Sequence, residues 1–209
     1  MPTSCFLFSA QVCMMIKRLY VHESIYDKFR TALISKISPL KSGPGLEPDT
    51  FFGPLQNSMQ YEKVKSLFTH VIDGEKATPV LGGKIDPSAP GYFITPTIID
   101  NPPDTSRIVT EEPFGPILPL LKWSDEADVI ARANDTKMGL GASVWSKDVE
   151  RAERMARQLE AGSVWVNAHF SLAPDVPFGG HKWSGIGVEW GLDGLKAYCN
   201  PQSLWVYKA

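Results

Sequence analysis

The chain has 209 residues, of which 43% are hydrophobic and 21% are charged, so it is long enough to bury one substantial core. Its formal net charge of −2 gives no electrostatic reason to expect nucleic acid or an anionic membrane as a partner. No apolar run approaches the roughly 20 residues of a membrane span, and the first ten residues lack the basic segment of a secretory signal. These features predict a soluble protein.

The cysteines and histidines indicate neither a disulfide framework nor a metal site. Cys5, Cys13 and Cys199 are three in number and stand at unrelated spacings. The four histidines are also scattered, without the spacing of zinc ligands. A reducing compartment, and therefore the cytoplasm, is the expected location.

Taken in chain order, the first half predicts strands and helices separated by sharp connections. The predicted strands are 18–21, 92–99 and 117–121, and the predicted helices are 24–35, 57–73 and 124–133. Ser124 is the expected N-cap of the last helix, because acidic residues follow it in the first turn.

The second half continues the alternation. We expect strands at 142–145, 163–167 and 203–207, a helix at 146–160 capped by Ser146, and a short helix near 193–198. Strands that alternate with helices predict an α/β fold with a largely parallel sheet flanked by helices. Many chemistries use such folds, so the function must be read from local motifs.

Five local motifs occur in the order and register of one known family, and together they resemble the aldehyde dehydrogenase superfamily. They are F-S-A-Q-V-C at 8–13, E-E-P-F-G-P-I at 111–117, N-D-T-K-M-G-L at 134–140, G-S-V-W-V-N at 162–167 and P-F-G-G-H-K-W-S-G-I-G at 177–187. The resemblance implies an aldehyde dehydrogenase catalytic domain over 1–200 and a C-terminal oligomerisation strand over 201–209. It also implies NAD or NADP as cofactor and a small-molecule aldehyde as substrate.

Cys13 stands at the position of the family's nucleophile. Oxidising an aldehyde by hydride transfer requires a tetrahedral adduct, which a thiolate forms as a thiohemiacetal that later becomes a thioester. We expect a helical turn over 12–17 whose positive potential favours the thiolate, with the Cys13 N–H helping to hold the oxyanion. The alternative is a small buried hydrophobic residue, which is the expectation for Cys5 and Cys199.

Glu112 and Phe114 are the expected cofactor residues. The resemblance implies that Glu112 accepts hydrogen bonds from the hydroxyls of the nicotinamide ribose and that Phe114 packs beside the nicotinamide. A carboxylate suits a diol, because its two oxygens accept two donors. The alternative is that Glu111 and Glu112 form a solvated acidic pair at a turn.

Asn167, His169, Phe170 and Phe178 are the expected substrate-side residues. The resemblance implies that His169 and Phe170 line the aldehyde tunnel and that Phe178 lies in a turn beneath it. Asn167 either orients backbone near the site or ends its strand, and both alternatives stay open. For Lys182, a surface ion pair is at least as well supported as a catalytic role.

Three departures from the family pattern bear on activity. Phe8 stands where an Asn is usual and Ala10 where a Gly is usual, and we expect Ala10 to be tolerated only at negative φ. The segment at 82–84, G-G-K, resembles a family element that is expected before the cysteine rather than after it. We therefore interpret the likeness as coincidental. The family's cofactor-binding fold, side-chain oxyanion donor and general base precede the cysteine, where this sequence has twelve residues.

Three hypotheses follow from the motifs and the departures. The chain belongs to a functional aldehyde dehydrogenase, is a truncated and inactive relative, or is an interaction module that pairs with a full-length homologue through its last strand. A homo-oligomer is the related expectation. Loss of the hydride acceptor's fold predicts that the chain alone does not turn over aldehydes.

Overall fold

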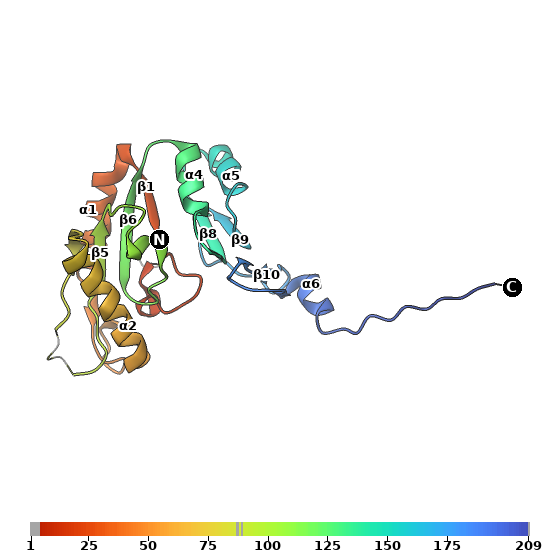
Figure 1. Cartoon of the computed structure of the whole chain (residues 1–209), viewed down its shortest axis with the longest axis horizontal. Helices are drawn as coiled ribbons and strands as arrows, with labels where there is room; N and C mark the ends of the chain where they lie inside the picture. The colour runs from red at the N-terminus through yellow and green to blue at the C-terminus, as the bar shows by residue number, and fades with distance from the viewer. Residues whose placement is uncertain (1–4, 87, 89, 209) are drawn as a thin grey trace. The chain divides into compact units, whose positions relative to one another are not determined.

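The computed structural model describes residues 5–86, 88 and 90–208, and it divides into two compact units, Met1–Thr136 and Lys137–Ala209 (Figure 1). No helix within the described ranges is long and apolar enough to cross a membrane. The predicted limits of the catalytic domain, 1–200, and of the strand segment, 201–209, stay predictions.

The first unit is built on a four-stranded sheet with the order β1-β6-β5-β4. β1 (Leu19–His22) and β5 (Thr97–Asp100) both run parallel to the central β6 (Ile117–Trp123), and β4 (Pro79–Leu81) adds an antiparallel edge. The predicted α/β fold with a largely parallel sheet is therefore confirmed. The predicted strand at 92–99 was placed too early, because Pro96 has no N–H to donate and the ladder begins at Thr97.

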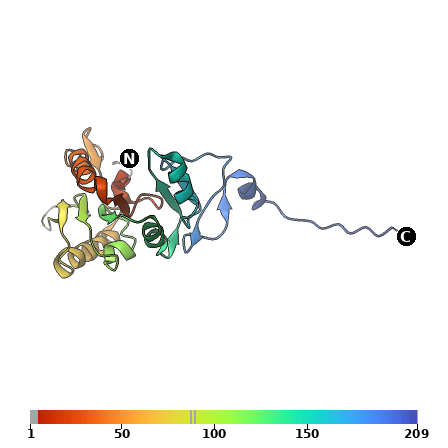
Figure 2. The same ribbon diagram turned by 90° about the horizontal axis from the view of Figure 1, so that it is seen from above.

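Helices cover both faces of this sheet (Figure 2). The longest are α1 (Tyr26–Ile37) and α2 (Ser58–Thr69), and α4 (Glu126–Asn134) follows β6. Smaller elements complete the unit: η2 (Leu7–Ala10), η3 (Glu23–Ile25), β2 (Lys41–Ser42), β3 (Thr50–Phe52), the π-helix η4 (His70–Gly74) and α3 (Arg107–Thr110).

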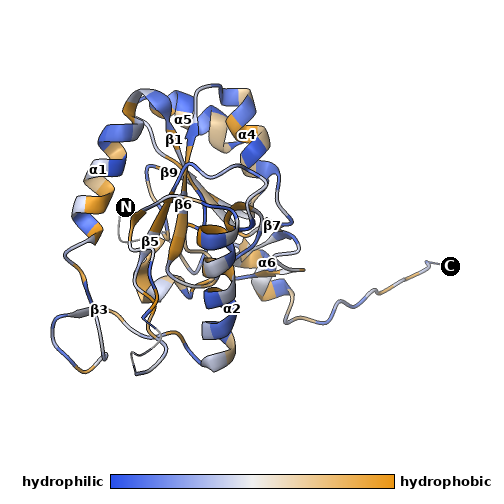
Figure 3. Cartoon of the chain, turned by 60° about the vertical axis from the view of Figure 1, so that its left-hand side comes forward, coloured by the Kyte–Doolittle hydropathy of each residue, from blue (hydrophilic) through white to orange (hydrophobic). Residues whose placement is uncertain are grey.

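The central strands are apolar on both sides because both faces are buried (Figure 3). Ile98 and Leu118 belong to a core cluster that includes Leu33 of α1. Their neighbours Ile99 and Ile117 point the other way, into a second cluster that contains residues of α2. Alternation along the strands therefore fixes which helix packs on which face.

The second unit consists of short strands and two helices. β8 (Gly141–Val144) and β9 (Ser163–Val166) pair in parallel and pack with α5 (Val149–Ala156). The remaining elements are two antiparallel pairs and one helix: β7 (Met138–Gly139) with β11 (His181–Lys182), β10 (Phe178–Gly179) with β12 (Val188–Glu189), and α6 (Gly191–Lys196).

Two predicted helix caps are wrong by one or two residues. Asp125, rather than Ser124, accepts the capping hydrogen bond of α4 from the N–H of Asp128. Asp148, rather than Ser146, caps α5 through the N–H of Arg151. In both cases a carboxylate further along the chain reaches the third residue of the helix, which is the geometry that a cap requires.

Two other predicted elements do not form. Residues 12–17 contain only a hydrogen-bonded turn, from the Met15 N–H to the Val12 carbonyl, and no helix. Residues 200–208 carry no helix or strand, so the predicted strand at 203–207 is absent from this chain by itself. An isolated strand leaves its hydrogen-bonding groups unmatched, which is why it needs a partner edge.

The segment at 82–84 proves to be a structural turn at the end of β4. Gly82 has φ of +69°, and a Cβ on it would lie 2.4 Å from the Pro96 carbonyl oxygen. The N–H of Gly83 donates to Thr97 Oγ1 at 3.0 Å. These glycines let the chain leave the sheet against β5, and this local role explains their presence.

Candidate active site

The topology of the first unit brings the turn that carries Cys13 and the turn that carries Glu112 to the same edge of the sheet. Cys13 precedes β1, and Glu112 precedes β6. Because β1 and β6 are parallel neighbours, with Leu19 opposite Leu120, both turns lie at the amino edge of the sheet. The turns of Cys13 and Glu112, about 100 positions apart in sequence, therefore lie at the same edge of the sheet.

The backbone before Cys13 is held in an unusual conformation. Phe8, Ser9 and Ala10 all have positive φ, between 53° and 59°. The expectation that Ala10 is tolerated only at negative φ is wrong, because Ala10 has φ of +59°. The Ser9 hydroxyl donates to the Gly53 carbonyl at 2.7 Å and helps to hold this strained segment against the loop that follows β3.

Gln11 ties the cysteine turn to the same loop by its side chain. Its Nε2 donates to the Pro54 carbonyl at 3.3 Å, and its Oε1 accepts from the Gln56 N–H at 2.9 Å. Cys13 itself is exposed, so its sulfur is accessible to a small electrophile. The absence of a helix over 12–17 removes a helix dipole as the source of positive potential at this thiol.

The turn that carries Glu112 and Phe114 rests on α2. Gln60 Nε2 donates to the carbonyls of Pro113 and Phe114 at 2.9 and 3.0 Å. Phe114 has φ of +51°, and the next residue, Gly115, approaches α2 so closely that a Cβ there would lie 2.7 Å from Val64 Cγ2. Packing against a buried helix therefore sets the conformation of the turn.

Lys17 connects the two turns. Its Nζ donates to the carbonyls of Ala10 and Val12 at 3.1 and 2.8 Å, one on each side of Gln11. The same Nζ lies 3.8 Å from Glu112 Oε1 and 4.7 Å from the centroid of the Phe114 ring. Burial lowers the pKa of Lys17, against the opposing effects of Glu112 and Cys13.

The other two cysteines differ from Cys13 in their surroundings. Cys5 is buried in the core cluster beside α1, and burial raises its pKa to about 12. A thiol of that kind stays protonated and unreactive. Cys199 is exposed, so the expectation that it is a small buried residue is wrong; it lies three residues after α6, with its Sγ 3.6 Å from the Leu195 carbonyl oxygen.

The four predicted substrate-side residues belong to the second unit and are described there by themselves. Asn167 follows β9 with φ of +52°; its Oδ1 accepts from the Ser146 N–H and its Nδ2 donates to the Ser146 carbonyl. This pair of hydrogen bonds links the ends of β8 and β9, so the strand-ending alternative describes what the side chain does here. Its role at a substrate site stays a prediction.

His169 and Phe170 follow the same strand, whereas Phe178 lies in β10. The His169 ring packs edge-on against Trp165 at 5.0 Å, Phe170 is exposed, and Phe178 packs against Trp190 at 5.6 Å. Their tunnel-lining role stays a prediction. Lys182 forms an ion pair with Glu160 at 2.6 Å, as its surface ion-pair alternative predicted.

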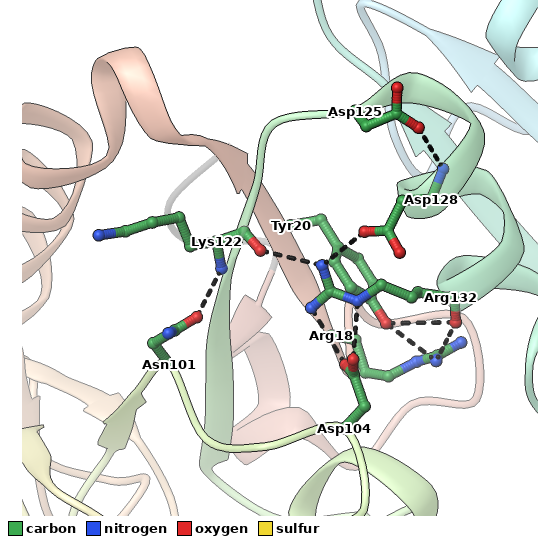
Figure 4. Close-up of polar contacts among 8 residues, drawn as sticks. All are labelled: Arg18, Tyr20, Asn101, Asp104, Lys122, Asp125, Asp128 and Arg132. Carbon is green, nitrogen blue, oxygen red and sulfur yellow. Dashed lines mark hydrogen bonds and ion pairs between the residues drawn. The ribbon is translucent and has the colours of Figure 1, made fainter.

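A hollow of about 610 Å³ opens at the carboxyl edge of the first unit's sheet, the edge opposite to Cys13. Its central cation is Arg132, whose guanidinium donates to both Asp104 carboxylate oxygens, to the Lys122 carbonyl and to Asp128 (Figure 4). Arg18 donates to the carbonyls of Arg132 and Ala133. Because these donors already have acceptors, the network stabilises the fold and leaves little for a ligand.

No group of three or more His, Cys, Asp or Glu residues that could hold a metal ion occurs among the described residues. Gln11 and Lys17 are the residues at this candidate site to which the sequence analysis gave no role. Gln11 belongs to the cysteine motif itself. Lys17 could have been noticed as a lysine that follows three apolar residues, four positions after the cysteine and two before β1.

An exposed thiol on a strained turn, joined through a half-buried lysine to a carboxylate and an aromatic ring, defines a candidate nucleophile site on an α/β unit. The model of the aldehyde dehydrogenase family matches residues 1–204. The chain therefore belongs to the aldehyde dehydrogenase family.

The most informative relatives are aldehyde dehydrogenases of greater length. The chain is 38% identical over 200 residues to the putative aldehyde dehydrogenase FUS7 of Gibberella fujikuroi, covering 96% of this chain and 41% of that protein. It is 39% identical to a betaine aldehyde dehydrogenase of Brucella anthropi, covering 96% and 42%. The chain thus spans about two fifths of the length of these relatives.

The fold is also that of solved family members. A betaine aldehyde dehydrogenase from Staphylococcus aureus, solved in complex with NAD+, matches with a TM-score of 0.87 and 37% identity, covering 99% of this chain and 43% of that one. Another structure of that enzyme contains NAD+ and a cysteine modified by BME.

Proposed function

We propose that this chain provides the nucleophile and part of the cofactor contact of an NAD- or NADP-dependent aldehyde dehydrogenase. The observation that carries the proposal is the meeting of the Cys13 turn with Glu112 and Phe114 at one sheet edge, through Lys17. The proposed reaction oxidises an aldehyde to a carboxylic acid.

In this mechanism, the Cys13 thiolate attacks the carbonyl carbon of the aldehyde. A carbon–sulfur bond forms, and the carbonyl oxygen becomes an oxyanion that the Cys13 backbone N–H helps to stabilise. The oxyanion collapses as hydride leaves the carbon, and the product is a thioester on Cys13. Water then attacks the thioester, the carbon–sulfur bond breaks, and the acid departs while the thiolate is restored.

The two residues expected to hold the cofactor fit that role in part. The Glu112 side chain is 31% exposed, so its carboxylate is accessible to the two hydroxyls of a ribose. The half-buried Phe114 ring offers a flat apolar surface beside it. When bound, NAD or NADP supplies the acceptor for the hydride.

The second candidate function is that of a partner for a longer homologue. The observation that favours it is the exposed apolar segment at the end of the described chain, where Leu204, Trp205, Val206 and Tyr207 are each at least 74% exposed. We propose that this segment adds as a strand to a second copy or to a full-length homologue. In this case the chain alone is inactive. The three free thiols fit a reducing compartment such as the cytoplasm.

Alkylation of the purified chain with iodoacetamide, followed by mass spectrometry of each cysteine peptide, tests the nucleophile. We expect Cys13 to react faster than Cys199, and added propanal to slow the alkylation of Cys13 alone, because the thiohemiacetal blocks its sulfur. Acetone, a poorer electrophile of similar size, is the matched reagent control. Equal reactivity of the two cysteines without protection by propanal would contradict the proposal.

A turnover assay tests whether the chain is active by itself. With NAD+ or NADP+ and an aldehyde, we expect the chain alone to form no reduced cofactor, and the Cys13→Ser variant serves as the blank. Formation of reduced cofactor at ordinary dehydrogenase rates would show that the 209 residues suffice and would rule out the inactive-partner function.

A further inference from the structure

Lys17 is a cation at the candidate site to which the proposed reaction assigns no role. Its side chain is only 17% exposed. Burying an ammonium group costs free energy unless hydrogen bonds and an opposite charge compensate. All of the compensation described for Lys17 comes from the two turns that carry the proposed nucleophile and cofactor residues.

On the cysteine side, the contacts are hydrogen bonds to backbone. The Ala10 and Val12 carbonyls both accept from Lys17 Nζ, at 3.1 and 2.8 Å, and Val12 is the residue immediately before Cys13. The Ala10 carbonyl belongs to the last residue of the left-handed segment. The Lys17 ammonium therefore helps to fix the backbone conformation immediately before Cys13.

On the cofactor side, the contacts are electrostatic. Glu112 Oε1 lies 3.8 Å from Lys17 Nζ, and the face of the Phe114 ring lies 4.7 Å from it. A cation over an aromatic face is attracted to the ring, and the attraction is stronger where water is excluded. The ammonium thus attracts both residues of this turn.

We propose that Lys17 is a positioning residue that holds the Cys13 turn at a fixed distance from the Glu112–Phe114 turn. This inference rests on the proposed function for its chemical meaning. Hydride transfer requires the adduct on Cys13 to lie at a defined distance from the nicotinamide, and an error of about 1 Å can cost on the order of a hundredfold in rate. A single half-buried cation that contacts both turns provides that constraint.

The position of the ammonium can be tested with two alkylating reagents of different charge. Iodoacetate and iodoacetamide form the same kind of carbon–sulfur bond with loss of iodide, but only iodoacetate is an anion. We expect the ratio of the iodoacetate rate to the iodoacetamide rate at Cys13 to fall about three- to fivefold in Lys17→Met, the size of an interaction between unit charges a few ångströms apart in water. Glu112→Gln removes the negative charge beside the ammonium, so the ratio should rise.

Each variant is compared with internal and matched controls. The same ratio at Cys199 should not change, and Lys65→Met removes a surface lysine that pairs with Glu62 and should leave Cys13 unaffected. If Lys17→Met does not fold, Glu112→Gln still tests the proposal. An unchanged ratio at Cys13 in every folded variant of Lys17 or Glu112 would overturn it.

Hydrogen exchange tests the constraint between the turns. In Lys17→Met, we expect faster exchange both at 10–15 and at 111–116, with β5 and β6 unchanged. Faster exchange throughout the unit, or at 10–15 alone, would mean a general structural role and would overturn the proposal. Neither measurement requires turnover. The exchange and rate-ratio results can therefore contradict the role of Lys17 while Cys13 still reacts selectively with aldehydes. Conversely, Cys13 can lack that selectivity, which contradicts the proposed function, while the role of Lys17 is supported.

Discussion

Single residues before Cys13 hold the backbone in a conformation that L-amino acids avoid. A residue other than glycine in the left-handed region costs about 1–2 kcal/mol. At Ala10, a change to glycine would relieve this strain but would lose a buried methyl worth about 0.8 kcal/mol and add chain entropy worth about 0.4–1 kcal/mol to the unfolded state. These terms nearly offset each other, so the alanine is tolerated.

Phe8 is a different case, because its side chain is 62% exposed and contributes little burial. Its φ is +53°, and asparagine adopts this region more readily than phenylalanine does. We expect Phe8→Asn to raise the free energy of unfolding by about 0.5–1 kcal/mol. The measurement is the midpoint of urea unfolding, with the slope of the transition checked for constancy.

Leu46→Asn is the matched control for this change. Leu46 is fully exposed in the same unit and does not have positive φ. It should therefore gain nothing from asparagine. An equal gain at both positions would mean that reduced surface hydrophobicity, rather than relief of backbone strain, explains the effect at Phe8.

At the scale of elements, Gly115 joins the cofactor turn to α2. An alanine Cβ at this position would lie 2.7 and 3.0 Å from the two methyl groups of Val64. Val64 is fully buried and β-branched, so it cannot rotate away at low cost. We expect Gly115→Ala to lower the free energy of unfolding by about 1–3 kcal/mol, measured by denaturant unfolding. Displacement of the Glu112 turn should also slow the alkylation of Cys13 relative to that of Cys199.

The double variant Gly115→Ala with Val64→Ala identifies the cause. If the clash with Val64 is responsible, the combined loss of stability should be smaller than the sum of the two single losses. Gly45→Ala is the control, because a Cβ at Gly45 meets nothing within 4 Å. Strict additivity of the two changes would contradict the steric explanation.

Most elements, but not their spatial order, could be predicted from the sequence. Apolar periodicity predicted α1, α2 and the strands β6 and β9 within a few residues, because these patterns are local. Strand order depends on pairing between distant segments, which periodicity does not encode. Pairing of β1 with β6, which assembles the candidate site, therefore became visible only in the structure.

The residues of the candidate site that belong to a family motif could be predicted from the sequence. Those that reach the site only through tertiary contacts could not. Cys13, Glu112 and Phe114 were predicted from family motifs, and the structure gathers their turns around Lys17. The sequence around Lys17 does not show that Lys17 contacts Glu112, and its proposed role depends on this contact between residues 95 positions apart. The missing helix over 12–17 is also a tertiary effect, because Gln11 and Ser9 bond to the loop at 53–56 instead.

At the scale of the whole molecule, one apolar segment of the described residues is largely exposed. Residues 200–208 have no regular secondary structure, and Leu204 to Tyr207 expose most of their surface. Contiguous exposed apolar residues mark an interaction surface. The chain spans about two fifths of the length of its relatives, and the partner that we propose for this segment is a second copy or a longer homologue.

Proline substitution tests whether this segment binds as a strand. Neighbouring N–H groups in a strand point to opposite sides, so either Trp205→Pro or Val206→Pro must remove a donor that faces the partner edge. We expect at least one of the two variants to weaken self-association, or association with a full-length relative, in sedimentation velocity. Thermal unfolding of both units should stay unchanged, because the segment contributes no core. Lys208→Pro lies outside the predicted strand and should have no effect. If association persists in both variants, the segment binds by some means other than strand addition, and its apolar side chains alone carry the contact.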